Sequence, residues 1–313
     1  MDVNNAFLHG VISEDIYMSQ PSGFIHPYFP NHICKLHKAL YGLKQAPRAW
    51  YQELKSFVVA YGFFNAKSDS SLFIYKQDHV FAYFLVYVDD LLLTGNDVIF
   101  LAKFKAALAT KFSLKDLGTS SHFLGVELLP TANGMFLSQQ HYIWDILQKD
   151  WGGDTNDKKS TGAYIVYLAP NAISWSCKKQ STFARSSIEA EYRIIGLIAS
   201  ELLWLQQLLL ELGIKLTKQP TIFSDNIGAT YLCANPIFHS RMKHLAIDYH
   251  FVRDIVAKGE LKVSHVPSSH QLADLLTKPL SWPRHEFLIT KIGVVTSSSI
   301  LQGHISDKFK HSI

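Results

Sequence analysis

The chain has 313 residues, of which 48% are hydrophobic, and it carries 30 Lys and Arg against 26 Asp and Glu. This length is enough for two ordinary domains with a sizeable core. The formal net charge of +4 allows a nucleic acid as a partner but does not require one. Three widely spaced cysteines without a C-x-x-C pair exclude a disulfide framework and favour a reducing compartment.

Local patterns in the first part of the chain predict alternating helices and strands. Pro47 suits a first helical turn, and the residues after it place apolar side chains at helical spacing. Asn96 or Asp97 can cap a later helix. The expected elements are, in chain order, a helix over 47–61, a strand over 71–75, a hairpin around 87–90, a helix from 97 to about 112, strands over 123–128 and 135–138 joined by a turn at 132–134, and a helix beginning within 141–147.

A polar stretch over 149–159 separates this part from a second pattern of strands and helices, so we place a domain boundary near residue 150. Ser186 and Glu189 have the spacing of a capping box before a long helical segment. The expected elements are strands over 163–168 and 172–176, a helix over 187–212, strands over 221–223 and 261–266 with two helical stretches between them, and a short helix over 271–277.

Two features bear on a membrane location. The N-terminus lacks the basic segment and apolar core of a signal peptide. The most apolar long stretch, 194–212, is interrupted by Glu201, Gln206 and Gln207. This pattern is typical of an amphipathic or buried helix rather than a transmembrane segment, so we expect no membrane partner.

The most informative segment is Tyr87-Val88-Asp89-Asp90, which interrupts two apolar runs. Two adjacent carboxylates between buried strands are costly without a partner, and a divalent metal ion suits two hard oxygen ligands. An exposed hairpin turn explains the same four residues equally well, because Asp is a common turn residue. On these residues alone, a metal site and a simple turn both remain open.

Three acids in the second part of the chain have comparable positions. Glu191 lies one turn into the long predicted helix, Asp225 follows a predicted strand, and Asp274 lies on the last short helix. Each alone is most simply a solvated surface acid. An alternation of strands and helices with an acid at each of these places is far less common. This pattern indicates a relation to a known protein family.

Short motifs in a fixed order carry this resemblance. The first block contains DVNNAFLHG at 2–10, IYMSQP at 16–21, KL at 35–36, LYGLKQAPR at 40–48, YVDD at 87–90 and KDLG at 115–118. The second contains STG at 160–162, SWSCKKQ at 174–180, EAEY at 189–192, SDN at 224–226, HSR at 239–241, KH at 243–244 and QLADLLTK at 271–278. Over about residues 1–295, the chain resembles the polymerase and ribonuclease H portion of copia-type retrotransposon polyproteins, in particular those of plants.

The resemblance implies an RNA-directed DNA polymerase, or reverse transcriptase, followed by a ribonuclease H-like domain. The implied fold class is α/β (α+β). Residues 1–147 are expected to form a reverse transcriptase palm, a ferredoxin-like sheet with helices, that lacks the fingers and thumb. Residues 148–295 are expected to form a ribonuclease H-like mixed sheet that lacks its first strand, and 296–313 a disordered tail.

For the polymerase, the resemblance assigns Asp2 and Asp89 as ligands of two Mg²⁺ ions, with Asp90 beside them and Mn²⁺ as an alternative metal. Such ions activate the attacking hydroxyl and neutralise charge on the leaving group. Mg²⁺ suits this chemistry because it needs only one or two carboxylates and keeps positions for phosphate and water.

The resemblance also assigns residues that bind substrate. Phe7 matches an aromatic residue that closes the sugar pocket and favours deoxynucleotides, and a core aromatic is the alternative interpretation of this residue. Gln45 matches a glutamine near the incoming nucleotide. Lys44 and Arg48 are expected to meet phosphates, and without the family they would be ordinary solvated side chains.

For the nuclease, Glu191, Asp225 and Asp274 match three of four acids that hold two metal ions for hydrolysis of RNA paired to DNA. His265 and His270 lie near the place of a loop histidine in related nucleases, but an ordinary exposed histidine is at least as good an interpretation of either. The histidines at 239, 244 and 250 show no zinc spacing.

The partners implied by the family are an RNA template, a DNA primer, RNA–DNA hybrids and deoxynucleotides, together with other products of the polyprotein. The implied locations are the cytoplasm, including virus-like particles, and the nucleus.

The chain departs from the family at three places. It begins at the first catalytic strand, so we expect the fingers subdomain to be missing. It passes from 139–143 directly to 150–154, where the family has its thumb and connecting region. That jump also removes the first nuclease strand, so the first of the four acids falls near Gln148, with Asp150 as a candidate replacement.

These departures predict a truncated remnant with weak or no activity, because catalysis needs positioning as well as metal. An alternative from another class is a non-catalytic nucleic-acid-binding module derived from a transposon, held by Lys178, Lys179, Arg241 and Lys243. A third alternative is a chain without a stable fold, which a cooperative thermal unfolding transition would exclude.

Overall fold

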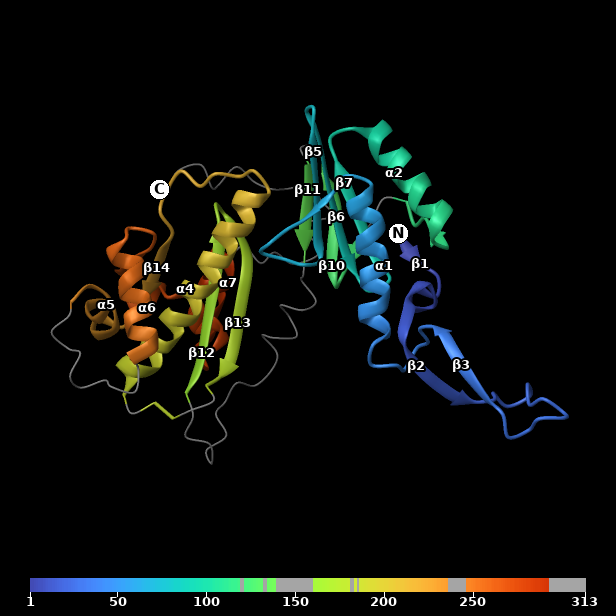
Figure 1. The fold of residues 1–313 in the computed structure, drawn as a ribbon. Helices are drawn as coiled ribbons and strands as arrows, with labels where there is room; N and C mark the ends of the chain where they lie inside the picture. The colour runs from blue at the N-terminus through green and yellow to red at the C-terminus, as the bar shows by residue number, and fades with distance from the viewer. Residues whose placement is uncertain are drawn as a thin grey trace. The chain divides into compact units, whose positions relative to one another are not determined.

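The computed structural model describes residues 1–118, 121–131, 134–138, 160–180, 183–184, 186–235 and 246–292. The chain divides into two compact units, one formed by Met1–Ser138 with Leu210–Ile214 and the other by Gln139–Leu209 with Lys215–Ile313. Both units contain helices and several small sheets (Figure 1). The protein is therefore a mixed α+β protein, as its sequence predicts.

A six-stranded sheet in the order β4-β5-β6-β7-β1-β8 organises the first unit. All neighbouring strands are antiparallel. The strands are β1 (Asp2–Val3), β4 (Phe64–Asn65), β5 (Leu72–Gln77), β6 (Val80–Tyr87), β7 (Asp90–Gly95) and β8 (Leu114–Lys115). Because β1 pairs with β7, the start of the chain lies beside the β6–β7 turn.

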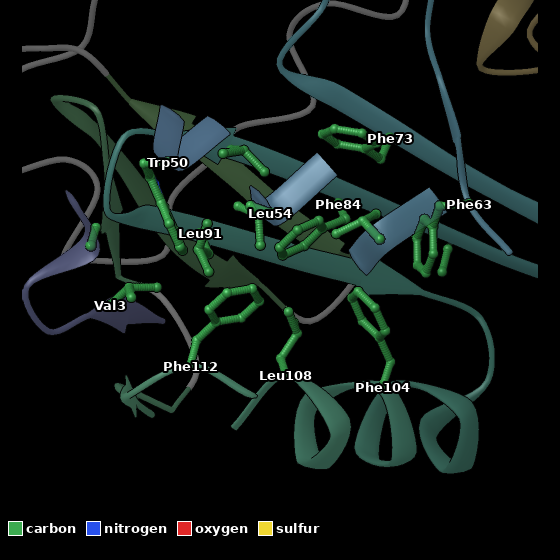
Figure 2. Packing of buried hydrophobic residues seen from close by; sticks show 14 residues of the cluster. Val3, Trp50, Leu54, Phe63, Phe73, Phe84, Leu91, Phe104, Leu108 and Phe112 are labelled. Carbon is green, nitrogen blue, oxygen red and sulfur yellow. The ribbon is translucent and has the colours of Figure 1, made fainter. Parts of the chain in front are cut away.

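Helices α1 (Ala46–Ala60) and α2 (Val98–Lys111) share one core with this sheet. Trp50, Leu54 and Val58 recur at four-residue spacing on α1 and are at most 1% exposed, which forms a continuous buried stripe. Phe104 and Leu108 of α2 project toward the sheet from the other side of the cluster (Figure 2). The helix predicted over 47–61 is confirmed.

The predicted cap of α2 is also confirmed. The Asp97 carboxylate accepts hydrogen bonds from the backbone N–H groups of Ile99 and Phe100, both at 2.9 Å. These bonds satisfy two of the donors that a helix leaves free at its first turn.

Two smaller antiparallel sheets complete the first unit, and a short 3₁₀ helix, η1 (Ala6–His9), follows β1. The strand expected over 123–128 is divided into two, because Leu124 and Gly125 have φ angles of 50° and 78°. This left-handed backbone cannot continue a strand and forms a turn instead. The strands are β2 (Val11–Ser19) with β3 (Ile33–Lys38), and β9 (His122–Phe123), β10 (Val126–Thr131) and β11 (Gly134–Ser138).

The second unit contains two separate two-stranded sheets. The antiparallel pair β12 (Thr161–Leu168) and β13 (Asn171–Lys179) matches the prediction. The strand β14 (Thr221–Ser224) pairs in parallel with β15 (Lys262–His265). Within the described part of the chain, β12 and β14 each pair along one side only.

Helices cover these strands and supply most of the second core. Tyr192, Ile195 and Ala199 on α4 are at most 1% exposed. The Ser186 hydroxyl accepts a hydrogen bond from Glu189 N–H at 3.2 Å, which confirms the predicted capping position. The helices are α4 (Ser187–Glu211), α5 (Ile227–Ala234), α6 (Ala246–Ala257), α7 (Trp282–Ile292) and the 3₁₀ helices η4 (Ser268–His270) and η5 (Leu272–Leu276).

Two expectations differ from the structure near the end of the chain. The short helix over 271–277 is a 3₁₀ helix, and α7 was not predicted at all. The expected turn at 132–133, the helix beginning within 141–147, the boundary near 150 and the tail over 296–313 lie outside the described residues.

Among the described helices, α4 is the one that is long and apolar enough to cross a membrane. Its apolar residues pack against α5 and α6 in the second core, and a core helix passes the same test of length and composition. The expected cytoplasmic and nuclear location stays a prediction.

Candidate catalytic sites

The turn between β6 and β7 has an unusual backbone. Val88 has a φ angle of 56°, in the left-handed region that β-branched residues rarely adopt. Such a conformation costs about 1–3 kcal/mol and persists only where the surrounding structure fixes it. The indole Nε1–H of Trp50 donates a hydrogen bond of 2.6 Å to the carbonyl oxygen of Val88. Helix α1 therefore holds the turn directly.

Trp50 itself has little freedom to move. Its side chain is 1% exposed and meets the Phe112 ring edge-on, with ring centroids 5.2 Å apart. A Cβ added at Gly10 would lie 2.8 Å from the backbone nitrogen of Trp50, so only glycine permits this approach of the chain to α1. Sequence reasoning placed Trp50 on the helix stripe but missed this role, although a buried indole N–H generally requires a partner.

The sheet register brings Asp2 and Asp90 together. They are directly opposite each other on β1 and β7. The neighbouring pair, Met1 and Leu91, exchanges both backbone hydrogen bonds, at 3.0 and 2.9 Å. Asp2 and Asp90 are consequently a non-hydrogen-bonded pair, the type whose side chains lie closest. Like charges in this position repel, and a cation would relieve the repulsion.

The adjacent Asp89 contributes to the turn through its backbone. Its carbonyl oxygen accepts a hydrogen bond of 3.1 Å from Val3 N–H, and its side chain is half-buried. The register makes Asp90 the direct cross-strand partner of Asp2, and the assignment of Asp2 and Asp89 as metal ligands stays a prediction. The three acids lie where β6 turns into β7 and β1 pairs with β7.

The expected substrate-binding residues lie around the start of α1. Phe7 is half-buried on η1 and packs against the Tyr41 ring, with centroids 4.4 Å apart. Gln45 occupies the N-cap position of α1 without a capping hydrogen bond from its side chain. Lys44 and Arg48 are exposed on either side of it. The elements η1 and α1 are in contact, so these residues belong to one region.

Three predicted acids approach one another in the second unit. Glu191 comes from the first turns of α4, Asp225 follows β14, and Asp274 lies on η5. Burial raises the pKa of Glu191, and the carboxylates of Asp225 and Asp274 raise it further, while Lys278 lowers it. The three carboxylates therefore share an electrostatic environment, as their predicted common role requires.

Two cations and a hydroxyl hold two of these acids. Arg284 Nη2 donates hydrogen bonds of 2.7 Å to Asp274 Oδ2 and to the carbonyl oxygen of Ser268. The Ser268 hydroxyl donates a hydrogen bond of 2.9 Å to Asp225 Oδ2. Lys278 Nζ lies 2.7 Å from Asp274 Oδ1 and 3.8 Å from Asp225 Oδ2. These contacts compensate the charge of Asp274, which is only 4% exposed.

The carboxylates of both units are hard oxygen donors of the kind that a divalent metal ion binds. No group of three or more His, Cys, Asp or Glu side chains is arranged to hold a metal within the residues that the structure describes. Mg²⁺, however, uses hard oxygen donors and requires only one or two carboxylates. The carboxylates of Asp2 and Asp90 fit that requirement, and so do those of Asp225 and Asp274, although Lys278 contacts both of the latter and Arg284 contacts Asp274.

Among the residues that the structure describes, no histidine belongs to a group that could hold a metal ion. His265 ends β15 and His270 ends η4, and His270 lies beside the Phe287 ring, with centroids 6.3 Å apart. His250 lies on α6, whereas 239 and 244 fall outside the described residues.

Glu191→Gln is expected to raise the thermal unfolding midpoint of the metal-free protein at pH 7. The raised pKa means that the folded state binds the proton of Glu191 more tightly than the unfolded state. Stability therefore falls as pH rises above the ordinary pKa of Glu, about 4.3, and the neutral amide removes this loss. Thermal unfolding scans from pH 4 to 8 in the presence of a chelator compare the midpoints of Glu191→Gln and of the unaltered protein. The two midpoints should converge toward pH 4.

The matched control for this prediction is Glu286→Gln, because Glu286 is exposed on α7. It should leave the midpoint nearly unchanged across the same pH range. Equal midpoints for Glu191→Gln and the unaltered protein at pH 7 would contradict the prediction.

Comparison with sequence models of known families identifies the family of this chain. The sequence model of the family "Reverse transcriptase (RNA-dependent DNA polymerase)" matches residues 1–161. The chain belongs to the reverse transcriptase family. No solved structure matches this reverse transcriptase-family chain.

Curated relatives place the chain among transposon polyproteins of plants. It is 41% identical to the Retrovirus-related Pol polyprotein from transposon RE1 of Arabidopsis thaliana, over 94% of this chain and 27% of that protein. The corresponding RE2 protein is 39% identical over the same shares. The polyprotein from transposon TNT 1-94 of Nicotiana tabacum is 28% identical over 93% of this chain and 30% of that protein. The resemblance to plant copia-type retrotransposon polyproteins is confirmed.

The chain spans less than a third of the length of these relatives. The alignment with the RE1 protein runs over 397 positions, more than the 313 residues of this chain. The relative therefore contains residues within the aligned region that have no counterpart in the reverse transcriptase-family chain.

Proposed function

We propose that this chain derives from an RNA-directed DNA polymerase with a ribonuclease H-like domain, keeps the carboxylates of both sites, and has weak or no polymerase activity. The observation that carries the proposal is the register of Asp2 opposite Asp90 beside the turn that Trp50 fixes. In this proposal the substrates are an RNA template, a DNA primer and deoxynucleotides, and the second site acts on RNA–DNA hybrids.

Asp2, Asp89 and Asp90 are the proposed holders of Mg²⁺ or Mn²⁺ in the polymerase site, and Glu191, Asp225 and Asp274 in the nuclease site. The metal supplies activation of a hydroxyl or water and neutralisation of phosphate charge. The protein itself positions the acids, because Trp50 fixes the turn that carries Asp89 and Asp90.

The residues around the start of α1 are proposed to bind the nucleotide. Phe7, which packs against Tyr41, is proposed to close the sugar pocket and to exclude a ribose 2′-hydroxyl. Gln45 orients the nucleotide, and the exposed cations Lys44 and Arg48 meet phosphate oxygens.

The sheet topology supports the proposed palm and ribonuclease H-like arrangement. In the first unit, a central antiparallel hairpin carries the acids and two helices pack on the sheet. Among the described residues of the second unit, the pairs β12–β13 and β14–β15 are separate sheets. One additional strand between β12 and β14 would join them, which agrees with a nuclease domain that lacks its first strand.

Loss of activity follows from what the chain lacks relative to its family. The RE1 alignment contains residues without a counterpart here, and the proposed gap includes the thumb and the first nuclease strand. A misplacement of substrate by about 1 Å can cost on the order of a hundredfold in rate. The carboxylates can thus persist while polymerisation does not.

Primer extension on an RNA template with Mg²⁺ or Mn²⁺ tests the proposal. We expect little incorporation by the unaltered chain, and no further loss in Asp89→Asn. Asp78→Asn is the control, because Asp78 is an exposed acid in the turn between β5 and β6, at the end of β6 opposite to Asp89. Robust incorporation that disappears only in Asp89→Asn would refute the inactive state and establish the polymerase site.

A non-catalytic nucleic-acid-binding role is the second candidate. Lys178 and Lys179 are both exposed at the end of β13, whereas residues 241 and 243 lie outside the described chain. Binding to an RNA–DNA hybrid that weakens steeply with salt would support this role. Hybrid binding that does not change with salt would count against it.

A further inference from the structure

The ammonium group of Lys278 occupies an unusual position between two acids of the second unit. It lies 2.7 Å from Asp274 Oδ1 and 3.8 Å from Asp225 Oδ2. Lys278 N–H donates a backbone hydrogen bond of 3.0 Å to the Asp274 carbonyl oxygen, so one helical turn brings their side chains together. The lysine therefore holds its charge at the carboxylates that the proposed function assigns to a metal.

A second cation fixes the same acids from another direction. Arg284 binds the other oxygen of Asp274 and the carbonyl oxygen of Ser268, and the Ser268 hydroxyl binds Asp225. This network orients both carboxylates without help from Lys278. The side chain of Lys278 is 50% exposed, whereas that of Arg284 is 35% exposed. Arg284 is thus part of the hydrogen-bond network that orients the carboxylates, whereas Lys278 contacts them from a more exposed position.

We propose that Lys278 is a built-in counterion of this acid cluster, which a divalent metal ion must displace in order to bind. The inference rests on the proposed function of Glu191, Asp225 and Asp274 as a metal site. The lysine ammonium is a compact charge on a flexible stem, so it can leave toward solvent without disturbing the Arg284 network. Metal and ammonium compete for the same two carboxylates.

Competition has a measurable consequence for affinity. Each half-exposed ion pair contributes only a small interaction free energy. Loss of the two contacts of Lys278 therefore corresponds to a change in metal affinity of about three- to tenfold. Lys278→Met removes the charge and keeps an unbranched apolar stem of similar length. We expect this variant to bind Mn²⁺ about three- to tenfold more tightly than the unaltered chain, and Lys278→Arg to bind no more tightly.

Titration calorimetry of the full metal-free chain with Mn²⁺ is the experiment. Lys258→Met is the matched control, because Lys258 is exposed just beyond the end of α6. It should bind Mn²⁺ as the unaltered chain does. If Mn²⁺ binds the unaltered chain, Asp225→Asn weakens that binding and Lys278→Met binds no more tightly, the competition is refuted while the metal site stands. Binding that Asp225→Asn leaves unchanged belongs to another part of the chain and refutes the metal site in the second unit.

If no variant binds Mn²⁺, both the competition and the proposed metal site are refuted. A second measurement uses the unaltered chain, so it tests the displacement of Lys278 even if Lys278→Met does not fold. Acylation of lysine amines, followed by mass spectrometry of peptides, should proceed faster at Lys278 when Mn²⁺ is present and at the same rate at Lys258. Equal rates at Lys278 with and without Mn²⁺, at concentrations where binding is established, would overturn the displacement.

Discussion

Trp50→Ala is expected to lower the free energy of unfolding of the first unit by about 3–5 kcal/mol, the usual cost of truncating a buried large aromatic residue. The side chain is 1% exposed, packs against Phe112, and donates the hydrogen bond that holds Val88. The substitution removes packing and releases a backbone that is already strained. Denaturant unfolding, with hydrogen exchange of amides in β6 and β7, measures the loss and localises it.

Two further variants separate these contributions. Trp50→Phe keeps an aromatic ring but removes the donor to Val88, so it should cost less than Trp50→Ala and still loosen the turn. Val59→Ala is the control on the same helix, because Val59 is 45% exposed. Equal protection of the turn amides in Trp50→Phe and the unaltered chain would show that the hydrogen bond does not hold the turn.

Tyr192→Ala should destabilise the second unit by a comparable amount, about 3–5 kcal/mol. Tyr192 is fully buried on α4, its ring centroid lies 6.0 Å from that of Tyr249, and its hydroxyl donates to the Tyr249 carbonyl oxygen at 3.4 Å. Truncation leaves a cavity between α4 and α6. Thermal or denaturant unfolding gives the size of the effect, and hydrogen exchange in α4 and α6 assigns it to this unit.

Leu197→Ala is the appropriate comparison, because Leu197 lies on the same helix and is 59% exposed. Its effect should stay within about 0.5 kcal/mol, as for other surface substitutions. A loss for Tyr192→Ala no larger than that for Leu197→Ala would contradict the assignment of Tyr192 to the core.

Local signals in the sequence predicted most of the elements. The periodic apolar residues of α1 and α4, the Asp97 cap and the pairing of β12 with β13 all depend on neighbours along the chain. The turn at Leu124 and Gly125 was missed because a non-glycine residue adopts a left-handed backbone there. The helix α7 was missed although Ser281 and Pro283 mark its start in the manner of many helices.

The sequence predicted the acids of the candidate sites, but it did not predict the residues that contact them or hold their backbone. Asp2 and Glu191 follow from motifs in the sequence. The choice of Asp90 as the partner of Asp2 depends on sheet register, which no local pattern in the chain specifies. The contacts of Trp50 with Val88 and of Arg284 with Asp274 join different elements, so only the folded chain shows them.

The one-sided pairing of β12 and β14 has a practical consequence for handling this protein. Within the described residues, each strand leaves a row of backbone donors and acceptors without a neighbouring strand. Such rows are templates on which other polypeptides can add as strands. Association of the purified chain through these edges would rise with its concentration, and Tyr164→Pro, which removes one backbone donor from β12, is expected to reduce that association.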